Sequence, residues 1–312
     1  MHFLSHAVHF LGIGAHKAGT TWLWSMLRAH PQIWTAPLKE LHYFDRSLRY
    51  FSANTLAADR LFERLFSQAR HNLEFRRDCR VQIARALHLR DWRLLRWTLR
   101  YYLGPRHDQW YLSLFGAGAG QVRGEITPAY AMLERHDVAR VHRLLANAKI
   151  IFLLRNPIDR AWSHLRFEWM QGRFRAVDDI AQVRALLEHP GVTLRNDYLR
   201  TLRTWESAFP REQIFVGFYD DIVARPDVLL RDVFTFLEVE ESVARTNKTV
   251  VLPSKKLPMP PEIRRYLTEK YLPAIEKLAM RFGGHAERWR AEASTIAGRS
   301  SATGIAGRDE KD

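Results

Sequence analysis

The stretch VHFLGIGAHKAGTTWL, residues 8–23, decides the fold expected of this 312-residue chain. Its first part, Val8–Gly14, is apolar and ends at glycine, which is typical of a short buried strand. Residues 15–20 are small or polar and predict a loop. From Thr21 apolar residues recur at helical spacing until Pro31 ends the pattern. Strand, glycine-bearing loop and helix in this order predict a phosphate site, because the loop and the helix N-terminus direct N–H groups at an anion.

This loop differs chemically from the phosphate loop of nucleoside triphosphatases. Gly14 and Gly19 have the right separation, but Thr20 stands where those enzymes need a lysine. The loop's own lysine, Lys17, lies between the two glycines. A second predicted strand ends at Arg155 rather than at an aspartate that could hold Mg²⁺. These residues favour a phosphate cradle that works without a metal.

Two further apolar runs extend the pattern to a sheet. Lys149–Leu154 is followed by a turn and by an amphipathic helix over residues 158–171. Gln213–Phe218 precedes a helix that continues through Phe236. Continuous apolar strands that alternate with helices are typical of a parallel sheet covered on both faces. The expected fold class is therefore α/β, a parallel sheet flanked by helices with a P-loop-like core.

Two motifs resemble those of the sulfotransferases that use 3′-phosphoadenosine 5′-phosphosulfate (PAPS). Residues 17–23, KAGTTWL, are similar to the family's 5′-phosphosulfate loop, and residues 155–163, RNPIDRAWS, to its 3′-phosphate motif R-x-P-x-x-R-x-x-S. The resemblance spans about residues 10–282 and implies a sulfotransferase core that binds PAPS, releases PAP and needs no metal. The donor-binding residues that it implies are Lys17, Ala18, Gly19, Thr20, Thr21, Trp22, Arg155 and Ser163. Lys255 and Lys256 stand where relatives have a basic loop over the 3′-phosphate.

A third motif resembles the glycan branch of this family, the heparan sulfate 3-O-sulfotransferases and their bacterial relatives. Residues 39–45, KELHYFD, match that branch's K-E-x-H-F-F-D, and residues 125–130, EITPAY, match E-K-x-P-x-Y except that Ile126 replaces the lysine. The resemblance implies Glu40 as the general base, Lys17 on the leaving phosphate, and His42 and Asp45 as residues that orient Glu40 or the substrate. It implies a hydroxyl acceptor, less readily an amine, on a carbohydrate-containing or small molecule.

Each of these residues could also have a purely structural role. Trp22 could be a core residue of the first helix, His42 a packed and hydrogen-bonded ring, and Glu40 and Asp45 surface carboxylates. Glu125 is interpreted as a buried salt-bridge partner. Two other functions share the same motifs: a P-loop nucleotide kinase or triphosphatase, and a non-catalytic protein that binds an anionic glycan or a membrane on the same fold.

Residues 51–116 lack strand patterns and predict a helical, arginine-rich insertion at about 52–115. Residues 76–106 contain nine arginines and two aspartates, so this stretch carries 9 − 2 = +7 of the chain's +14 net charge. Such a mixture of arginine, leucine and tryptophan can contact a polyanion or a membrane surface, or it can pack on the core with its arginines extended into water. No nucleic-acid-binding module accompanies the charge, so nucleic acid is not an expected partner.

The remaining composition excludes several protein classes. The single cysteine, Cys79, can form neither an intrachain disulfide nor a cysteine-rich zinc site. Neither a basic leader nor an apolar run of ~20 residues is present, so a cytoplasmic protein is expected. Residues 1–292 are expected to form one domain. Residues 293–312 are rich in small polar residues and end in charges, which predicts a disordered tail.

Overall fold

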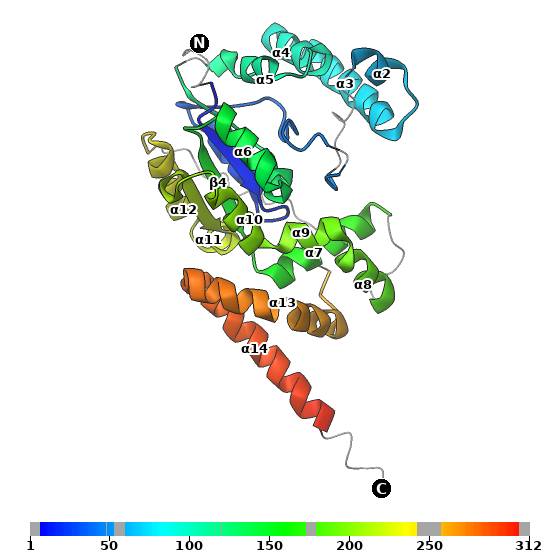
Figure 1. Ribbon diagram of the computed structural model, residues 1–312, viewed down its shortest axis with the longest axis vertical. Helices are drawn as coiled ribbons and strands as arrows, with labels where there is room; N and C mark the ends of the chain where they lie inside the picture. The colour runs from blue at the N-terminus through cyan, green and yellow to red at the C-terminus, as the bar shows by residue number, and fades with distance from the viewer. Residues whose placement is uncertain are drawn as a thin grey trace.

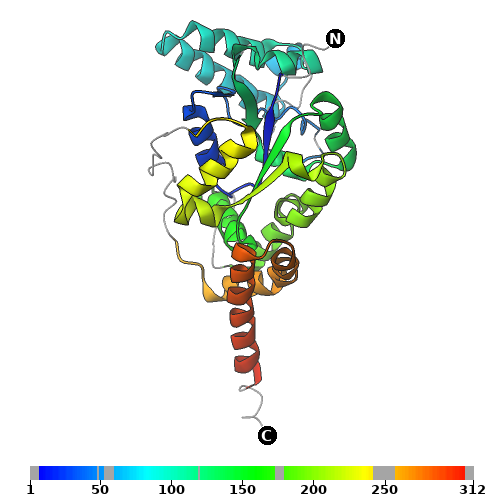
Figure 2. The ribbon, with the colours of Figure 1, turned by 90° about the vertical axis from the view of Figure 1, so that its left-hand side faces the viewer.

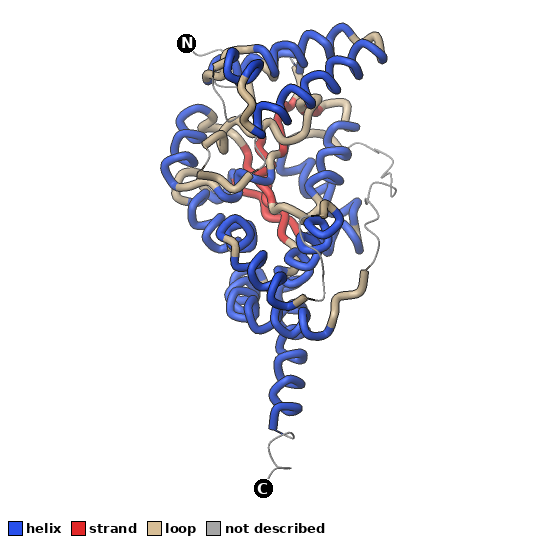
Figure 3. Tube along the Cα trace, turned by 90° about the vertical axis from the view of Figure 1, so that its right-hand side faces the viewer, coloured by secondary structure: helices blue, strands red, loops and turns tan. Residues whose placement is uncertain are grey.

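The computed structural model describes residues 7–47, 49–52, 60–118, 120–172, 179–241 and 257–305. Five strands form one sheet in the order β2-β3-β1-β4-β5, and every neighbouring pair is parallel. The strands are β1 (Phe10–Gly14), β2 (Ile33–Thr35), β3 (Val122–Ile126), β4 (Lys149–Leu154) and β5 (Ile214–Phe218). Figure 3 shows the strands at the centre of the molecule with helices around them. The predicted α/β class is therefore confirmed.

Helices cover both faces of the sheet. In Figure 2, α1 (Thr20–Ala29) and α12 (Pro226–Leu237) lie on one side, and α6 (Arg135–Leu144) and α10 (Tyr198–Glu206) on the other. The remaining helices of the main body are α7 (Pro157–Met170), α8 (Ile180–Glu188), α9 (Pro190–Asn196), α11 (Tyr219–Ala224), α13 (Pro261–Phe282) and α14 (Gly284–Ile305). The described part of the chain contains no helix with the length and apolar character that a membrane crossing requires.

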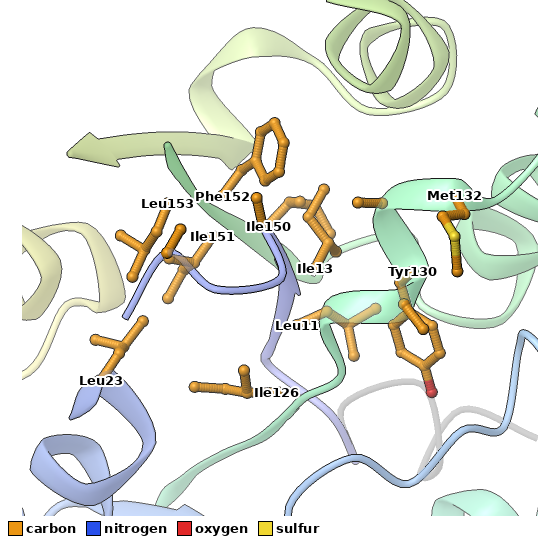
Figure 4. Packing of buried hydrophobic residues seen from close by; sticks show 14 of the residues in the cluster. Leu11, Ile13, Leu23, Ile126, Tyr130, Met132, Ile150, Ile151, Phe152 and Leu153 are labelled. Carbon is orange, nitrogen blue, oxygen red and sulfur yellow. The ribbon is translucent and has the colours of Figure 1, made fainter. Parts of the chain in front are cut away.

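The core lies between the central strands and these helices. Figure 4 shows Leu11, Ile13, Ile150 and Phe152 packed together, all of them buried. Ile126 lies over Gly12, where an added Cβ would approach its Cγ1 to 2.7 Å. Each fully buried aliphatic side chain contributes about 1.5–3 kcal/mol, so this layer holds the strand ends in place.

The structure confirms three predicted strands and adds two. β1, β4 and β5 match the apolar runs seen in the sequence. β2 has only three residues, which is too short for a pattern to appear. β3 reads VRGEI, and its Glu125 is fully buried because other polar groups satisfy it. A buried strand with a charged residue near its end does not look like a core strand in the sequence.

Four helices occupy the segment predicted as an insertion: α2 (Leu61–Phe66), α3 (Arg70–His88), α4 (Trp92–Leu103) and α5 (Asp108–Ser113). Figure 1 shows them as a layer at one end of the molecule, with α14 at the opposite end. α3 and α4 pack against each other, and Asp91 between them caps α4 by accepting a hydrogen bond from the Leu94 amide at 2.9 Å.

The tail is helical as far as Ile305, which corrects the expectation of disorder from residue 293. α14 packs along α13 and buries Ala286, Trp289 and Ala293. The apolar contact on α13 stabilises a helix whose own sequence signal is weak. Residues 306–312 and the Lys255–Lys256 pair lie outside the described residues.

Candidate active site

The phosphate loop follows β1 at the carboxyl edge of the sheet, the edge where open α/β sheets bind ligands. Gly19 precedes α1 with φ of 88°, and an added Cβ there would lie 2.3 Å from Ile222 Cδ1. No side chain caps α1, and its first turn carries no acidic residue. The first N–H groups of α1 are therefore available to an anion, which is the arrangement that the sequence predicted.

Cations surround this helix N-terminus. Arg155, at the end of β4, donates from Nη1 to the Lys17 carbonyl at 3.1 Å, and its guanidinium lies 4.3 Å from the Tyr219 ring centre. Burial, followed by Arg155 and Arg166, lowers the pKa of the Lys17 ammonium. Positive groups crowded into a half-buried site repel one another, so a bound anion would relieve them.

Arg155 also lines a pocket of about 350 Å³. The start of α7 contributes Asn156 and Asp159, α11 contributes Tyr219 and Asp220, and α14 contributes Arg288 and Trp289. Sequence reasoning identified Arg155 but assigned no role to Tyr219 or Arg288. The position of Tyr219 directly after a predicted strand was a usable signal, whereas nothing in the sequence connected Arg288 with this edge.

Four of the predicted donor residues are buried: Ala18, Thr20, Trp22 and Ser163. Ser163 lies further along α7 at 7% exposure and is not among the residues that line the pocket. Trp22 on α1 is 5% exposed and belongs to the hydrophobic core. The burial of Trp22 favours a packing role for this ring, and a contact with a ligand stays a prediction for both residues.

Glu40, His42 and Asp45 come together in one row. His42 Nδ1 lies 2.7 Å from Asp45 Oδ2, and its Nε2 lies 3.6 Å from Glu40 Oε2. Asp45 is fully buried, whereas the Glu40 side chain keeps 33% of its surface exposed. The imidazole thus links a buried carboxylate to one that can reach a ligand.

The charges of this row are mutually dependent. Burial opposes the charged form of His42, but Asp45 and then Glu40 outweigh it and raise the pKa of His42 to about 10. Burial also acts against ionised Glu40, yet His42 and Lys39 hold the pKa of this carboxyl well below its usual range. At neutral pH, Glu40 is therefore a carboxylate beside an imidazolium, and its oxygens can accept a hydrogen bond.

The backbone is strained at the residues that were singled out from the sequence. Lys17, Glu40 and His42 have φ of 68°, 67° and 53°. These left-handed conformations are unfavourable for residues with a Cβ and cluster at functional sites. The Glu40 loop lies at the same edge of the sheet as the phosphate loop. The Glu40 amide donates to the Ile126 carbonyl at 3.1 Å, where β3 ends, and the Thr127 amide that follows donates to the Gly12 carbonyl of β1 at 2.8 Å.

The buried Glu125 side chain is hydrogen-bonded to the loop that carries Glu40. Its Oε2 accepts from the Leu41 amide at 3.2 Å and from the Thr127 hydroxyl at 2.7 Å. Its Oε1 accepts from the hydroxyls of Tyr111 at 2.7 Å and Tyr130 at 2.9 Å. The predicted salt-bridge role is therefore wrong, since hydroxyl and amide donors satisfy this carboxyl group and no cation among the described residues does so. A cation is unnecessary because burial raises the pKa of Glu125.

His16 and His164 form a neutral pair beside Lys17. Their ring centroids lie 5.7 Å apart in an edge-to-face arrangement. Burial, followed by nearby arginines, lowers the pKa of His16 to about 3 and that of His164 to about 2. Neither ring carries charge at neutral pH, so the positive charge beside the phosphate loop comes from lysine and arginine.

Comparisons with known proteins relate this chain to sulfotransferases. A family model described as "Sulfotransferase family" matches residues 10–242. The fold resembles that of a sulfotransferase from Alicyclobacillus acidocaldarius, with TM-score 0.61, 22% identity, and 91% of this chain and 98% of that chain covered. The sulfotransferase domain of the Synechococcus PCC 7002 olefin synthase aligns with TM-score 0.49, 17% identity, and coverage of 85% of this chain and 94% of that chain. No curated protein sequence matches the chain.

Proposed function

Because this chain belongs to the sulfotransferase family, we propose that it transfers a sulfuryl group from PAPS to an acceptor hydroxyl and releases PAP. One observation carries this proposal: the uncapped N-terminus of α1, with Lys17 and Arg155 beside it, lies at the same edge of the sheet as the loop that holds the Glu40 carboxylate. Anion-binding groups and a candidate base therefore meet at one edge of the sheet.

The donor set fits a ligand with two anionic groups. The N–H groups of Thr20 and Thr21 and the Lys17 ammonium suit the 5′-phosphosulfate. Arg155, whose Nε is buried and has no hydrogen-bond partner among the described residues, suits the 3′-phosphate together with Ser163. Lysine and arginine at these positions supply the positive charge that a metal ion supplies in phosphoryl transfer, so we propose a reaction that needs no metal.

In the proposed step the acceptor oxygen forms a bond to sulfur while the bond between sulfur and the 5′-phosphate oxygen breaks. Glu40 takes the hydroxyl proton, and Lys17 with the α1 N–H groups stabilises the charge that grows on the leaving phosphate. His42, held by Asp45 at 2.7 Å, fixes the direction of the Glu40 carboxylate. Four side chains thus divide base, positioning and leaving-group roles.

The acceptor is proposed to be a carbohydrate-containing or small molecule, on the basis of the KELHYFD motif. Ile126 is 1% exposed and packs over Gly12 in the core. The position that carries a lysine in the heparan sulfate branch therefore contributes no cation here. We expect an acceptor that is less anionic than heparan sulfate.

Thermal shift measurements with PAP, ADP and ATP, each with and without Mg²⁺, test the donor site. A ligand at ~100 times its Kd stabilises the native state by about 2.7 kcal/mol. We expect a large shift with PAP that EDTA does not change, and a much smaller one with ADP, because ADP lacks the 3′-phosphate that Arg155 would bind. A shift with only ATP and Mg²⁺ would identify a kinase instead, and no shift with any nucleotide would favour the non-catalytic alternative.

Glu40→Gln tests the base. This variant should keep the PAP shift and lose turnover about 10²–10⁴-fold, the usual contribution of general acid–base catalysis. Glu262→Gln, at an exposed position of α13, is the matched control and should retain both the PAP shift and the turnover. Full turnover in Glu40→Gln, measured with labelled PAPS and an acceptor panel, would remove Glu40 from the mechanism.

A further inference from the structure

The inserted helices carry most of the large apolar side chains that the described residues expose. Of fifteen such side chains, ten lie between Leu61 and Leu103. Phe62 is 74% exposed, Phe66 62% and Trp92 70%. Isolated apolar residues on a surface are normal, but a concentration of this kind in one segment marks an interaction surface.

The same surface is strongly basic. Residues 60–106 contain twelve arginines and four acidic residues, 12 − 4 = +8, and no lysine. Arg64 and Arg106 are buried, which leaves an excess of 10 − 4 = +6 among the arginines that reach the surface. Arginine is the cation best suited to phosphate, because its planar group donates two parallel hydrogen bonds.

Apolar and basic side chains share the exposed side of α4. On α4, Trp92, Arg96, Leu99 and Leu103 follow one another at intervals of four, three and four residues, and all are exposed. That spacing places them on one side of the helix. We name the exposed side chains of α2, α3 and α4 the outer face.

The opposite side of α4 and α5 packs within the layer and against the body. Trp97 donates from Nε1 to the Leu114 carbonyl at 2.8 Å, and the Tyr101 hydroxyl donates to the Leu41 carbonyl at 3.2 Å. Tyr111 stacks on Tyr43 with centroids 4.4 Å apart. The outer face is therefore the second, unpartnered side of a layer whose inner side already holds the loop that carries Glu40.

We propose that the outer face docks on the surface of an anionic lipid bilayer. Exposed phenylalanine and tryptophan enter the boundary between headgroups and acyl chains, and arginines bind the lipid phosphates. A second copy of this chain fits poorly, because two faces with an excess of +6 would repel each other. A soluble anionic glycan would satisfy the arginines but would leave Phe62, Phe66 and Trp92 in water.

The position of the layer suits this orientation. Figure 1 shows α2, α3 and α4 at the end of the molecule farthest from α14, so the body would extend away from the bilayer. The inner side of the docked layer would contact the Glu40 loop through Tyr101 and Tyr111. A molecule presented at the bilayer surface would thereby lie on the side of the protein that holds this loop.

Sedimentation with vesicles of phosphatidylglycerol and phosphatidylcholine (1:1), compared with vesicles of phosphatidylcholine alone, tests the proposal without any measurement of activity. Two variants divide the contributions: Phe62→Ser/Phe66→Ser/Trp92→Ser removes the rings, and Arg80→Gln/Arg93→Gln/Arg96→Gln removes three charges. Arg203→Gln/Arg264→Gln/Arg265→Gln removes three exposed charges elsewhere, and Met280→Ser removes a side chain that is 78% exposed on α13. Unchanged circular dichroism and Tm verify the fold of each variant.

We expect binding to the phosphatidylglycerol vesicles only, with a loss of roughly 100-fold in the Arg80/Arg93/Arg96 variant, about fivefold for each charge. The aromatic variant should lose binding by at least tenfold, and both controls should bind like the parent protein. Absence of binding at 0.15 M salt would overturn the proposal. If the Arg203/Arg264/Arg265 control loses as much vesicle binding as the Arg80/Arg93/Arg96 variant, the proposal is also overturned, because the vesicles then attract the basic protein as a whole and not its outer face. Heparin binding together with unimpaired vesicle binding by the aromatic variant would identify a polyanion site instead.

Discussion

Gly19→Ala is the sharpest test of the phosphate loop, because two separate costs can be assigned to one added methyl group. Gly19 has φ of 88°, a left-handed conformation that costs a residue with a Cβ about 1–2 kcal/mol. The new Cβ would also lie 2.3 Å from Ile222 Cδ1, and such overpacking costs typically ~1–3 kcal/mol. The free energy of unfolding should therefore fall by roughly 2–5 kcal/mol.

A double-mutant cycle separates these two contributions. Ile222→Val removes the methyl group that collides and by itself costs about 0.5–1.5 kcal/mol. In the Gly19→Ala/Ile222→Val protein the collision is gone, whereas the backbone strain remains. The combined cost should thus be about 1–3 kcal/mol smaller than the sum of the single costs, a coupling within the range found for residues in contact.

Urea unfolding followed by tryptophan fluorescence supplies all four free energies, and PAP thermal shifts on the same proteins report the anion site. We expect the PAP shift to remain reduced in the double variant, because the strain lies in the loop that presents the N–H groups. Additive free energies, with no coupling between the two sites, would refute the packing of α11 against this loop. A full PAP shift in Gly19→Ala would refute the role of the loop itself.

Three further substitutions follow from the site. Lys17→Met should leave Tm unchanged or higher, because burial and Arg155 already disfavour this charge, and should reduce turnover at least ~10²-fold; a lower Tm with full activity would contradict this. His42→Gln should lower the free energy of unfolding, with the full loss present below pH 6.5, because the pKa of His42 is raised to about 10 in the folded state. This loss should disappear as the pH rises through 10. If urea unfolding at a series of pH values gives the same loss at each pH, the ion pairs of His42 do not stabilise the fold. Glu125→Leu leaves four buried donors unpaired and should cost at least ~3 kcal/mol in urea unfolding, whereas a loss below about 1 kcal/mol would show that the Glu40 loop does not depend on it.

The elements that the sequence predicted well are those whose pattern is local. β4 was placed at Lys149–Leu154 because an apolar run of that length, rich in branched residues and bounded by a turn, is typical of a buried strand. The helix expected over residues 158–171 after a turn is α7, which begins at Pro157 with Asn156 as its cap. β3 escaped prediction because the reason for burying Glu125 lies in Tyr111 and Tyr130, whose hydroxyl groups reach it from outside the strand.

In the site too, the sequence predicted residues that belong to short motifs and missed contacts between distant segments. Lys17, Glu40 and Arg155 were identified from short motifs, since each motif sets a chemical group beside a loop or helix end. Trp22 looked like a ligand contact in the same motif, but α1 turns its ring into the core. Tyr219 was passed over because its partner, Arg155, lies far earlier in the chain and meets it only where β4 and β5 end side by side.

The motif resemblance pointed to Glu40, His42 and Asp45. By itself, the sequence determined the strand, loop and helix of the candidate anion site and the parallel sheet. These follow from periodicity and from residue types within a few positions, because local backbone geometry determines which of such neighbouring residues come into contact. The tertiary structure alone decided the charge state of His42, the upward pKa shift of Glu125, the burial of Trp22 and the exposed side of the arginine-rich helices. Those properties depend on which groups lose their contact with water when distant segments pack, and no local pattern records that loss.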